Sequence, residues 1–527
     1  MSFLAYFALI ATVTVIYLAF RIVIFPKLKI KKLKNKYGDQ VIVLYNFGSG
    51  LIQEKKKSLK QQGDSLGTIR KLLWSNPKAK AIIHNNASGQ IAYSFIDPEL
   101  IKQVHQQPEF FVKQVNHPAV LYLFSKSILC MQGKEWQKQR QFFGKSFHFE
   151  EIRNYLPIIK ETSQSVFGSI KENLSDSSQI EIQVVKICES VTSEVVFKAF
   201  FGFNSQNLIN GSQNSLVQEI VSIMTDSYRI FQFNKLAFIK FLIFRKRSYD
   251  FFPLQCEREI VQRLRKVKEE CDKIVQQRKQ QLLNNPSLYK YNFLDQYLKE
   301  ILLNKNQDIR EENIIDNFLA LLFAGTDTTG NMVGTSIFYL SQNPEIQNKA
   351  RDEVIELLRK NHQCNKMQDL YEQMTFEDIT NFNYLNSVLK ESLRLIPPAV
   401  NVFPRKVIKD LQIGKFQLKK GDAVNTNFIC GHYNPQVFKN PEQFDPSRWM
   451  NANEQNQFSF TPFSLGPRNC IGQHLAMIEG KCMLAYILLN FEIIPNLKVK
   501  VRKEAKMSYG LIPDNLVFFK KNCKNYD

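Results

Sequence analysis

The chain has 527 residues, and 44% of them are hydrophobic. This excludes a disordered protein and leaves room for one large domain or for two or three of average size. Its 70 basic residues outnumber its 49 acidic residues, and the formal charge of +21 favours nucleic acid, an anionic membrane or an acidic protein as a partner. Because the basic residues are scattered and no zinc-finger or RNA-binding motif occurs, no nucleic-acid partner is expected.

Residues 1–26 are predicted to form a single transmembrane anchor. Residues 3–20 carry no charge, and the apolar run continues past Arg21 to Pro26. About 20 apolar residues suffice for a helix to span a bilayer. Lysines crowd the basic connector that follows, residues 27–36, and such lysines mark the cytoplasmic side. A cleaved signal peptide would carry its positive charge before a shorter apolar stretch, so the anchor is the favoured interpretation.

Residues 37–527 are predicted to form one catalytic domain that is mainly α-helical with a minor β portion. Alternating apolar residues predict a strand over residues 88–97. Turn residues predict a β-hairpin over residues 405–425, and the tail over 491–520 alternates as strands do. Helical periodicity predicts further segments over residues 311–342, 345–359, 382–396 and 473–490.

Residues 228–253 combine many phenylalanines with lysines and arginines. One interpretation is an ordinary core segment. The alternative is a second surface that dips into a membrane, because basic and aromatic residues interleave there. The sequence leaves both open.

The segment from Phe463 to Gly472 is the most informative in the chain. None of the nine cysteines stands in a Cys-x-x-Cys pair, which argues against a disulfide framework or a Cys-rich zinc site. Cys470 precedes a predicted helix, whose dipole and free N–H groups favour thiolate over thiol. Arg468 adds a positive charge, and Gly466 and Gly472 allow tight turns. Such a loop can hold an axial haem ligand, although a structural cysteine in a turn is the plainer alternative.

The order Phe-x-x-Gly-x-Arg-x-Cys-x-Gly over these residues resembles the haem-binding loop of the cytochrome P-450 family. The resemblance implies the cytochrome P-450 fold and a b-type haem, iron protoporphyrin IX. Cys470 would be its metal ligand. Phe463, Arg468 and Gly472 would help to bind the cofactor.

Glu391 and Arg394 share one face of a predicted helix, and in an apolar helix such a pair is expected to be buried and to need a third partner. They resemble the family's Glu-x-x-Arg motif. Residues 441–449 resemble its meander motif, in which Arg448 would complete a structural Glu-Arg-Arg cluster.

Residues 324–329 place Gly, Asp and Thr, which are poor helix formers, inside a long apolar helix. We expect this segment to interrupt the helix. Residues that disfavour the structure in which they lie often mark a functional site. A kink with back-bonded threonines is the alternative. The segment resembles the family's oxygen-binding groove, which implies catalytic roles in proton delivery for Asp327 and Thr328.

Trp136 and Arg140 lie on one helix face because they are four residues apart. They resemble the family's Trp-x-x-x-Arg helix, which reaches a haem propionate. Arg405, after Pro404, matches the family's propionate-binding arginine downstream of Glu-x-x-Arg.

The resemblance implies a monooxygenase that inserts one atom of O2 into a lipophilic small-molecule substrate. Electrons would come from NADPH through a flavoprotein reductase, for which Lys134, Lys138, Lys145 and Lys481 are candidate contacts. The enzyme would sit in the endoplasmic reticulum membrane with its catalytic domain facing the cytosol. Two alternatives stay open: a haem-thiolate isomerase or dehydratase that acts on peroxides, and a non-catalytic haem sensor at the membrane.

Overall fold

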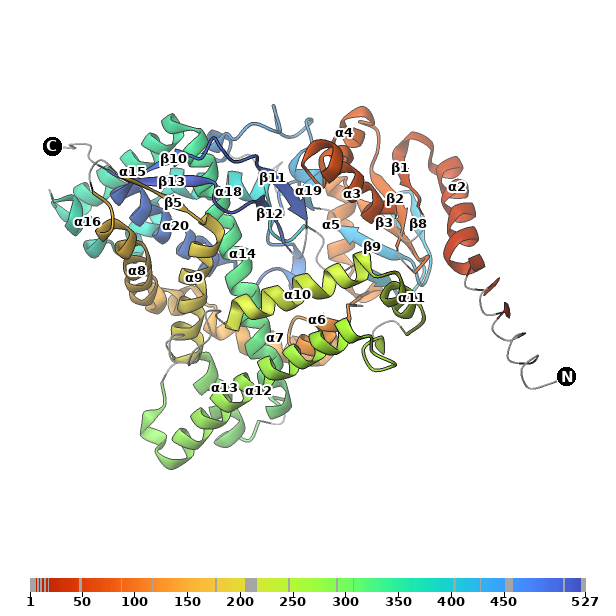
Figure 1. The fold of residues 1–527 in the computed structure, drawn as a ribbon, viewed down its shortest axis with the longest axis horizontal. Helices are drawn as coiled ribbons and strands as arrows, with labels where there is room; N and C mark the ends of the chain where they lie inside the picture. The colour runs from red at the N-terminus through yellow and green to blue at the C-terminus, as the bar shows by residue number, and fades with distance from the viewer. Residues whose placement is uncertain are drawn as a thin grey trace.

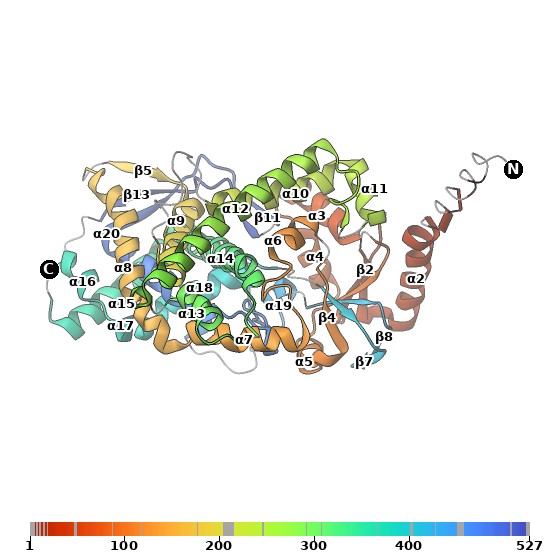
Figure 2. The ribbon, with the colours of Figure 1, turned by 90° about the horizontal axis from the view of Figure 1, so that it is seen from below.

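The structure is a computed structural model. It describes residues 6–522 except for 7–8, 10–11, 14–15, 18, 47–49, 87, 116, 176–177, 204–215, 245–246, 291, 307, 365, 401–403, 427, 451–457 and 506–507. Helices dominate, and the larger sheet lies at the end of the molecule that holds α2, while β5, β10 and β13 lie at the opposite end (Figure 1). The view from below shows the same division (Figure 2). The prediction of a mainly helical fold with small sheets is therefore confirmed.

The larger sheet has six strands in the order β1-β2-β3-β9-β6-β4. Its neighbouring residues Ile82 and Ile83 point to different apolar clusters, as alternation along a strand requires, so both faces of the sheet are covered. In the antiparallel pair β4 and β6, Lys113 lies directly opposite Arg405. The strands are β1 (Val41–Leu44), β2 (Ala81–Asn85), β3 (Ile91–Phe95), β4 (Phe111–Lys113), β6 (Arg405–Val407) and β9 (Ala423–Thr426).

Helix α2, Phe25–Tyr37, contains the basic stretch that was predicted as a connector. It packs on the larger sheet through buried Ile30, and the Nζ atom of Lys29 lies 2.6 Å from a carboxylate oxygen of Asp422. Residues 1–5 and several others before residue 19, which belong to the predicted anchor, lie outside the described part. Among the residues that the structure describes, no helix combines the length and apolar character needed to cross a membrane.

Helix α14, Ile314–Gln342, is the central element of the helical part and is buried over most of its length. Helix α9, Val184–Val196, packs closely along it, and α18 (Asn383–Leu395) and α20 (Gln473–Asn490) also contact it. The remaining helices are α3 (Gly50–Gln62), α4 (Gly67–Ser75), α5 (Pro98–Gln106), α6 (Pro118–Phe124), α7 (Gly133–Ser146), α8 (Phe149–Glu172), α10 (Leu216–Phe233), α11 (Lys235–Phe244), α12 (Gln255–Asn284), α13 (Phe293–Leu302), α15 (Pro344–His362), α16 (Met367–Gln373), α17 (Phe376–Asn381) and α19 (Phe428–His432).

The predicted strands of the tail form two separate units. One is a three-stranded sheet in which β13 (Val517–Lys521) pairs with β10 (Phe491–Pro495) and β5 (Gln179–Ile182). The other is the hairpin of β11 (Arg502–Ala505) and β12 (Tyr509–Ile512). The predicted hairpin over residues 405–425 divides between β6 and β9 of the larger sheet and the short pair β7 (Leu411–Ile413) and β8 (Phe416–Leu418).

A buried ion pair near the N-terminal end of the domain anchors the β11–β12 hairpin. Arg70 and Asp64 form this pair, and the Tyr509 hydroxyl donates to the second Asp64 carboxylate oxygen at 2.9 Å. The Tyr509 N–H also donates to the carbonyl of Pro398 at 2.9 Å. The hairpin is therefore fixed between segments that are far apart in the chain.

Replacing Gly330 by alanine is expected to lower the free energy of unfolding by about 1–3 kcal/mol, because overpacking forces backbone shifts. A Cβ atom there would lie 3.1 Å from the backbone nitrogen of Glu189 on α9 and 3.2 Å from its Cα atom. Gly144→Ala on α7 is the matched control, since no atom lies within 4 Å of a Cβ at that helical position. Urea unfolding followed by circular dichroism compares the two, and equal midpoints would contradict the packing argument.

Candidate functional site

The loop before α20 holds Cys470 in a closed turn. The Cys470 N–H donates to the carbonyl of Phe463 at 2.8 Å, which brings the two ends of the loop together. Gly466 has a φ of 72°, a conformation that glycine adopts at no steric cost. Gly472 has a φ of −90°, so its backbone conformation alone does not require glycine.

The Cys470 thiol is held by protein and remains reachable. Burial raises the pKa of this thiol, while the N–H of Gly472 and the positive charge of Arg140 act in the opposite direction. The side chain is nevertheless accessible to solvent. A sulfur atom that binds a metal ion must be held in a fixed position and must also be accessible to that ion.

Helix α7 is clamped to the residues that flank the cysteine. The Arg468 guanidinium stacks 3.7 Å from the centre of the Trp136 ring. The Nη2 atom of Arg140 donates to the side-chain oxygen of Asn469 at 2.8 Å. The two residues predicted from the Trp-x-x-x-Arg spacing therefore contact the cysteine loop directly.

Positive side chains gather beside this loop. Burial lowers the pKa of Arg405 to about 10, and burial with repulsion from Arg405 and Arg140 lowers that of Arg468 to about 10. Lys113 joins them, and burial followed by repulsion from both arginines contributes to lowering its pKa to about 7. In the described part of the chain, neither Arg405 nor Arg468 forms an ion pair, and Arg405 donates instead to the Thr426 hydroxyl at 3.2 Å. Such a cluster favours an anionic ligand.

The groove segment of α14 stays helical throughout, so the prediction that residues 324–329 interrupt the helix is wrong. The Thr328 hydroxyl donates to the carbonyl of Ala324 at 2.7 Å, a back-bond that satisfies this threonine without breaking the helix. Ala324 is exposed in the middle of a helix that is buried over most of its length. Its face of α14 therefore borders accessible space.

Asp327 is buried among polar partners. One carboxylate oxygen accepts from the side-chain nitrogen of Asn331 at 3.3 Å, and the other accepts from the hydroxyl of Ser508 beside β12. Burial raises the pKa of Asp327, and the Ser508 hydrogen bond opposes that shift. The acid is thus held between its own helix and the β11–β12 hairpin.

Glu391, Arg394 and Arg448 come together as the sequence predicted. Glu391 accepts from Arg394 at 2.7 and 2.9 Å and from the Nε atom of Arg448 at 3.2 Å. It also accepts from the Trp449 indole at 3.0 Å and from the backbone N–H of Asp445 at 3.0 Å. A buried charge pair is stable only when its remaining donors and acceptors are also satisfied, and this one meets that condition.

His432 links this cluster to the cysteine loop, which the sequence did not predict. Its carbonyl accepts from Arg394 at 2.9 Å, and its Nε2 atom accepts from the Thr461 N–H at 3.1 Å. Burial lowers the pKa of His432 to about 3, so the ring is neutral. The proton therefore sits on Nδ1, which donates to the Arg394 carbonyl at 3.3 Å.

A sequence profile of the cytochrome P450 family matches residues 82–518. The chain belongs to the cytochrome P450 family. It is therefore a haem-dependent monooxygenase, an oxidoreductase. The residues around the loop fit a haem, because Cys470 offers a reachable sulfur and the neighbouring cations suit the two propionates.

Three relatives illustrate the similarity. Cytochrome P450 4F8 of Homo sapiens is 28% identical over 381 residues, which cover 70% of this chain and 69% of the relative. Probable cytochrome P450 4s3 of Drosophila melanogaster is 26% identical over 420 residues, covering 76% and 78%. Taurochenodeoxycholic 6 alpha-hydroxylase of Sus scrofa is 28% identical over 380 residues, covering 70% of each chain.

One of the four lysines predicted to contact the reductase cannot do so. Lys481 is buried and donates to the backbone carbonyl of Ile379, so it cannot reach a docking protein. The sequence also gave no sign of Lys113 or Ser508. The first is placed by strand register and the second by a contact that spans 181 residues, and neither leaves a local pattern.

Replacing Glu391 by alanine is expected to lower the free energy of unfolding by about 3–5 kcal/mol, because Arg394 keeps a buried charge without its carboxylate. Glu377→Ala is the control, since Glu377 pairs with Arg153 at an exposed position and little change is expected. Thermal unfolding and the haem content of each purified variant provide the comparison. An equal loss of stability in both variants would contradict a special role for the buried cluster.

Proposed function

We propose that this chain hydroxylates a lipophilic small molecule at a haem held by Cys470, with electrons from NADPH delivered by a flavoprotein reductase. The observation that supports this most is the cysteine loop. It combines a reachable Sγ atom, a donated N–H from Gly472 and an adjoining cluster of arginines that form no ion pair with any described residue.

Cys470 would bind the iron, and Arg405, Arg468 and Arg140 would bind the propionates with Trp136 beside them. Lys113 lies opposite Arg405 and would join this set. A bound haem supplies the oxygen-activating chemistry, which no side chain in the chain can perform. The protein's part is to fix the haem, orient the substrate and deliver protons.

Thr328 and Asp327 would deliver those protons. Thr328 lies one helical turn from the exposed Ala324, and its hydroxyl can accept a hydrogen bond while donating to the Ala324 carbonyl. The raised pKa of Asp327 brings this acid closer to neutral pH, where a proton carrier works best. The presence of both Asp327 and Thr328 in this chain favours oxygen activation over the isomerase, dehydratase and sensor alternatives.

The surroundings of Ala324 favour a lipophilic substrate. Phe323 stacks on Phe124 of α6 with ring centres 5.6 Å apart, so aromatic rings border this stretch of α14. One relative is named for 6 alpha-hydroxylation of a taurochenodeoxycholic compound, which agrees with a lipophilic substrate class.

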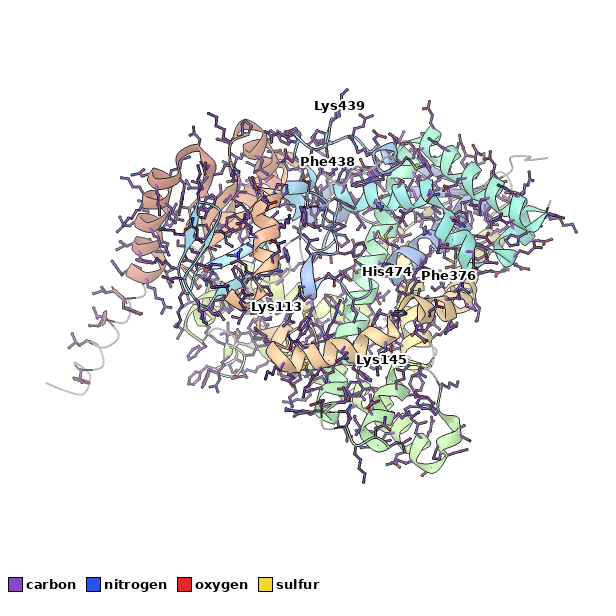
Figure 3. The ribbon with its side chains drawn as sticks, turned by 180° about the vertical axis from the view of Figure 1, so that it is seen from behind. Lys113, Lys145, Phe376, Phe438, Lys439 and His474 are labelled. Carbon is purple, nitrogen blue, oxygen red and sulfur yellow. The ribbon has the colours of Figure 1, made fainter. Side chains whose placement is uncertain are left out.

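The face that carries the start of α20 suits an acidic reductase. Lys145 on α7 and His474 on α20 lie on the same viewed face of the molecule (Figure 3). Phe149, which is 44% exposed, contacts the rings of His474 and Phe376 on this face. Lys138 forms an ion pair with Asp308 at 2.5 Å, so Lys134 and Lys145 are the better candidate contacts.

Two apolar surfaces support the proposed membrane location, which we infer to be the endoplasmic reticulum. Described residues before α2 expose large side chains, among them Ile16 and Tyr17. Around α11, the exposed set comprises Phe233, Leu236, Ile239, Ile243 and Phe252. Both views place α11 toward the end of the molecule that holds α2 (Figures 1 and 2). These surfaces favour the membrane-dipping interpretation of residues 228–253.

The Cys470→Ala variant is expected to lose the absorption band that a thiolate-ligated ferrous haem gives with carbon monoxide. The reason is that alanine offers no ligand atom to the iron. Cys256→Ala on α12 serves as the control and is expected to keep the band. A Cys470→Ala protein that retains it would overturn the assignment of the ligand.

The Thr328→Ala variant is expected to consume NADPH while forming roughly 10²-fold less product, because it lacks the hydroxyl that passes the proton. Thr328→Ser keeps that hydroxyl and is expected to restore most of the yield. Product formed per NADPH consumed is the measurement. If alanine and wild type give the same yield, Thr328 has no part in proton delivery.

A further inference from the structure

The carboxyl group of Asp327 does not face bulk solvent. It is buried, and its two oxygens accept from Asn331 and from Ser508. A proton that reaches Asp327 from outside must therefore pass between the elements that pack against this part of α14. Those elements include α9 and the β11–β12 hairpin.

Helix α9 brings a second carboxyl group to this position. Gly330 lies three residues after Asp327, so both lie on one face of α14. The backbone of Glu189 rests on Gly330, where a Cβ atom would be 3.1 Å from the Glu189 nitrogen and 2.6 Å from its Cγ atom. A further link holds the two helices in register, since the Thr192 hydroxyl lies 3.2 Å from the carbonyl oxygen of Thr326.

We propose that Glu189 is the outer acid of a two-carboxyl relay that carries protons from solvent to Asp327. This rests on the proposed function. In each transfer the O–H bond of the Glu189 carboxyl breaks, and the proton passes to an Asp327 carboxylate oxygen directly or over a bridging water. Glu189 then takes a new proton from solvent. No electrons move in this step, and the relay supplies protons that the reduction of O2 consumes.

The charges around Glu189 suit a donor. Asp327 on α14 and Asp514 in the loop before β13 face it with negative charge, and Lys186 on its own helix faces it with positive charge. Burial, followed by the two acids and opposed by Lys186, raises the pKa of Glu189 to about 8. Glu189 therefore holds its proton at neutral pH and loses it above about pH 8. Its half-buried side chain still reaches solvent for reloading.

A purely structural role makes a different prediction. If Glu189 only fills space against Gly330, then glutamine, which has the same shape, would preserve function. If Glu189 carries protons, Glu189→Gln would fold normally and fail at delivery. Glu194→Gln is the matched control, because Glu194 lies on the same helix and pairs with Lys198 at 3.7 Å.

The test uses the full-length holoenzyme with NADPH and a reductase, from about pH 6 to pH 9, across the pKa range of the relay. Wild type and Glu194→Gln should form less product per NADPH as the pH rises through about 8. Glu189→Gln should give roughly tenfold less product at neutral pH, with no such pH dependence. A Glu189→Gln enzyme with the wild-type yield and pH profile would overturn the proposal.

Two further measurements separate the relay from the proposed function. Hydrogen peroxide already carries the protons and electrons that O2 lacks, so peroxide-driven product formation should be equal in wild type and Glu189→Gln. A wild type that forms no product with either oxidant would refute the proposed function instead. In infrared titrations, wild type should show a carboxyl band that disappears near pH 8 and is missing from Glu189→Gln. If Glu189→Gln still shows a carboxyl band that disappears near pH 8, the relay is also overturned.

Discussion

The buried pair of Glu391 and Arg394 is the interaction on which the site depends. Both side chains are fully removed from solvent, and such a pair contributes only when every remaining donor and acceptor is used. Arg394 uses its other donors on the carbonyls of His432, Pro441 and Gln443. The pair therefore ties α18 to the end of α19 and to the irregular segment around Pro441 and Gln443.

From this pair, hydrogen bonds lead to the cysteine. The His432 ring accepts from the N–H of Thr461, and the Thr461 carbonyl accepts from the N–H of Ser464 at 3.0 Å inside the loop. On the opposite side, α7 grips the loop through Trp136 and Arg140. The position of the Cys470 sulfur is thus set by two independent supports rather than by its own short loop.

The sequence predicted the local parts of this arrangement well. The cysteine loop, the Glu391–Arg394 pair and the long helix are each encoded within a few residues, where spacing decides which side chains share a face. Arg448 was placed correctly because its meander motif is also short. The bounds of α20 agree with the helix predicted over residues 473–490.

What the sequence could not show depends on distant segments. Lys113 meets Arg405 through strand register, and Ser508 meets Asp327 through a hairpin held by Asp64 and Arg70. The charge of Lys481 predicts a surface position, yet Lys481 is buried because helix α20 is packed on all sides. Residues 324–329 remained helical because tertiary packing outweighs weak intrinsic preferences.

The hydrogen bond from Tyr509 to Asp64 joins residues that are 445 positions apart in the chain. During synthesis, Asp64 cannot form this hydrogen bond until Tyr509 has been added to the chain. Contacts so distant in sequence form slowly, and the apolar surfaces that they cover stay exposed meanwhile. The same hairpin that holds Asp327 in the mature enzyme therefore leaves the nascent chain prone to aggregation until residues 502–512 have been synthesised.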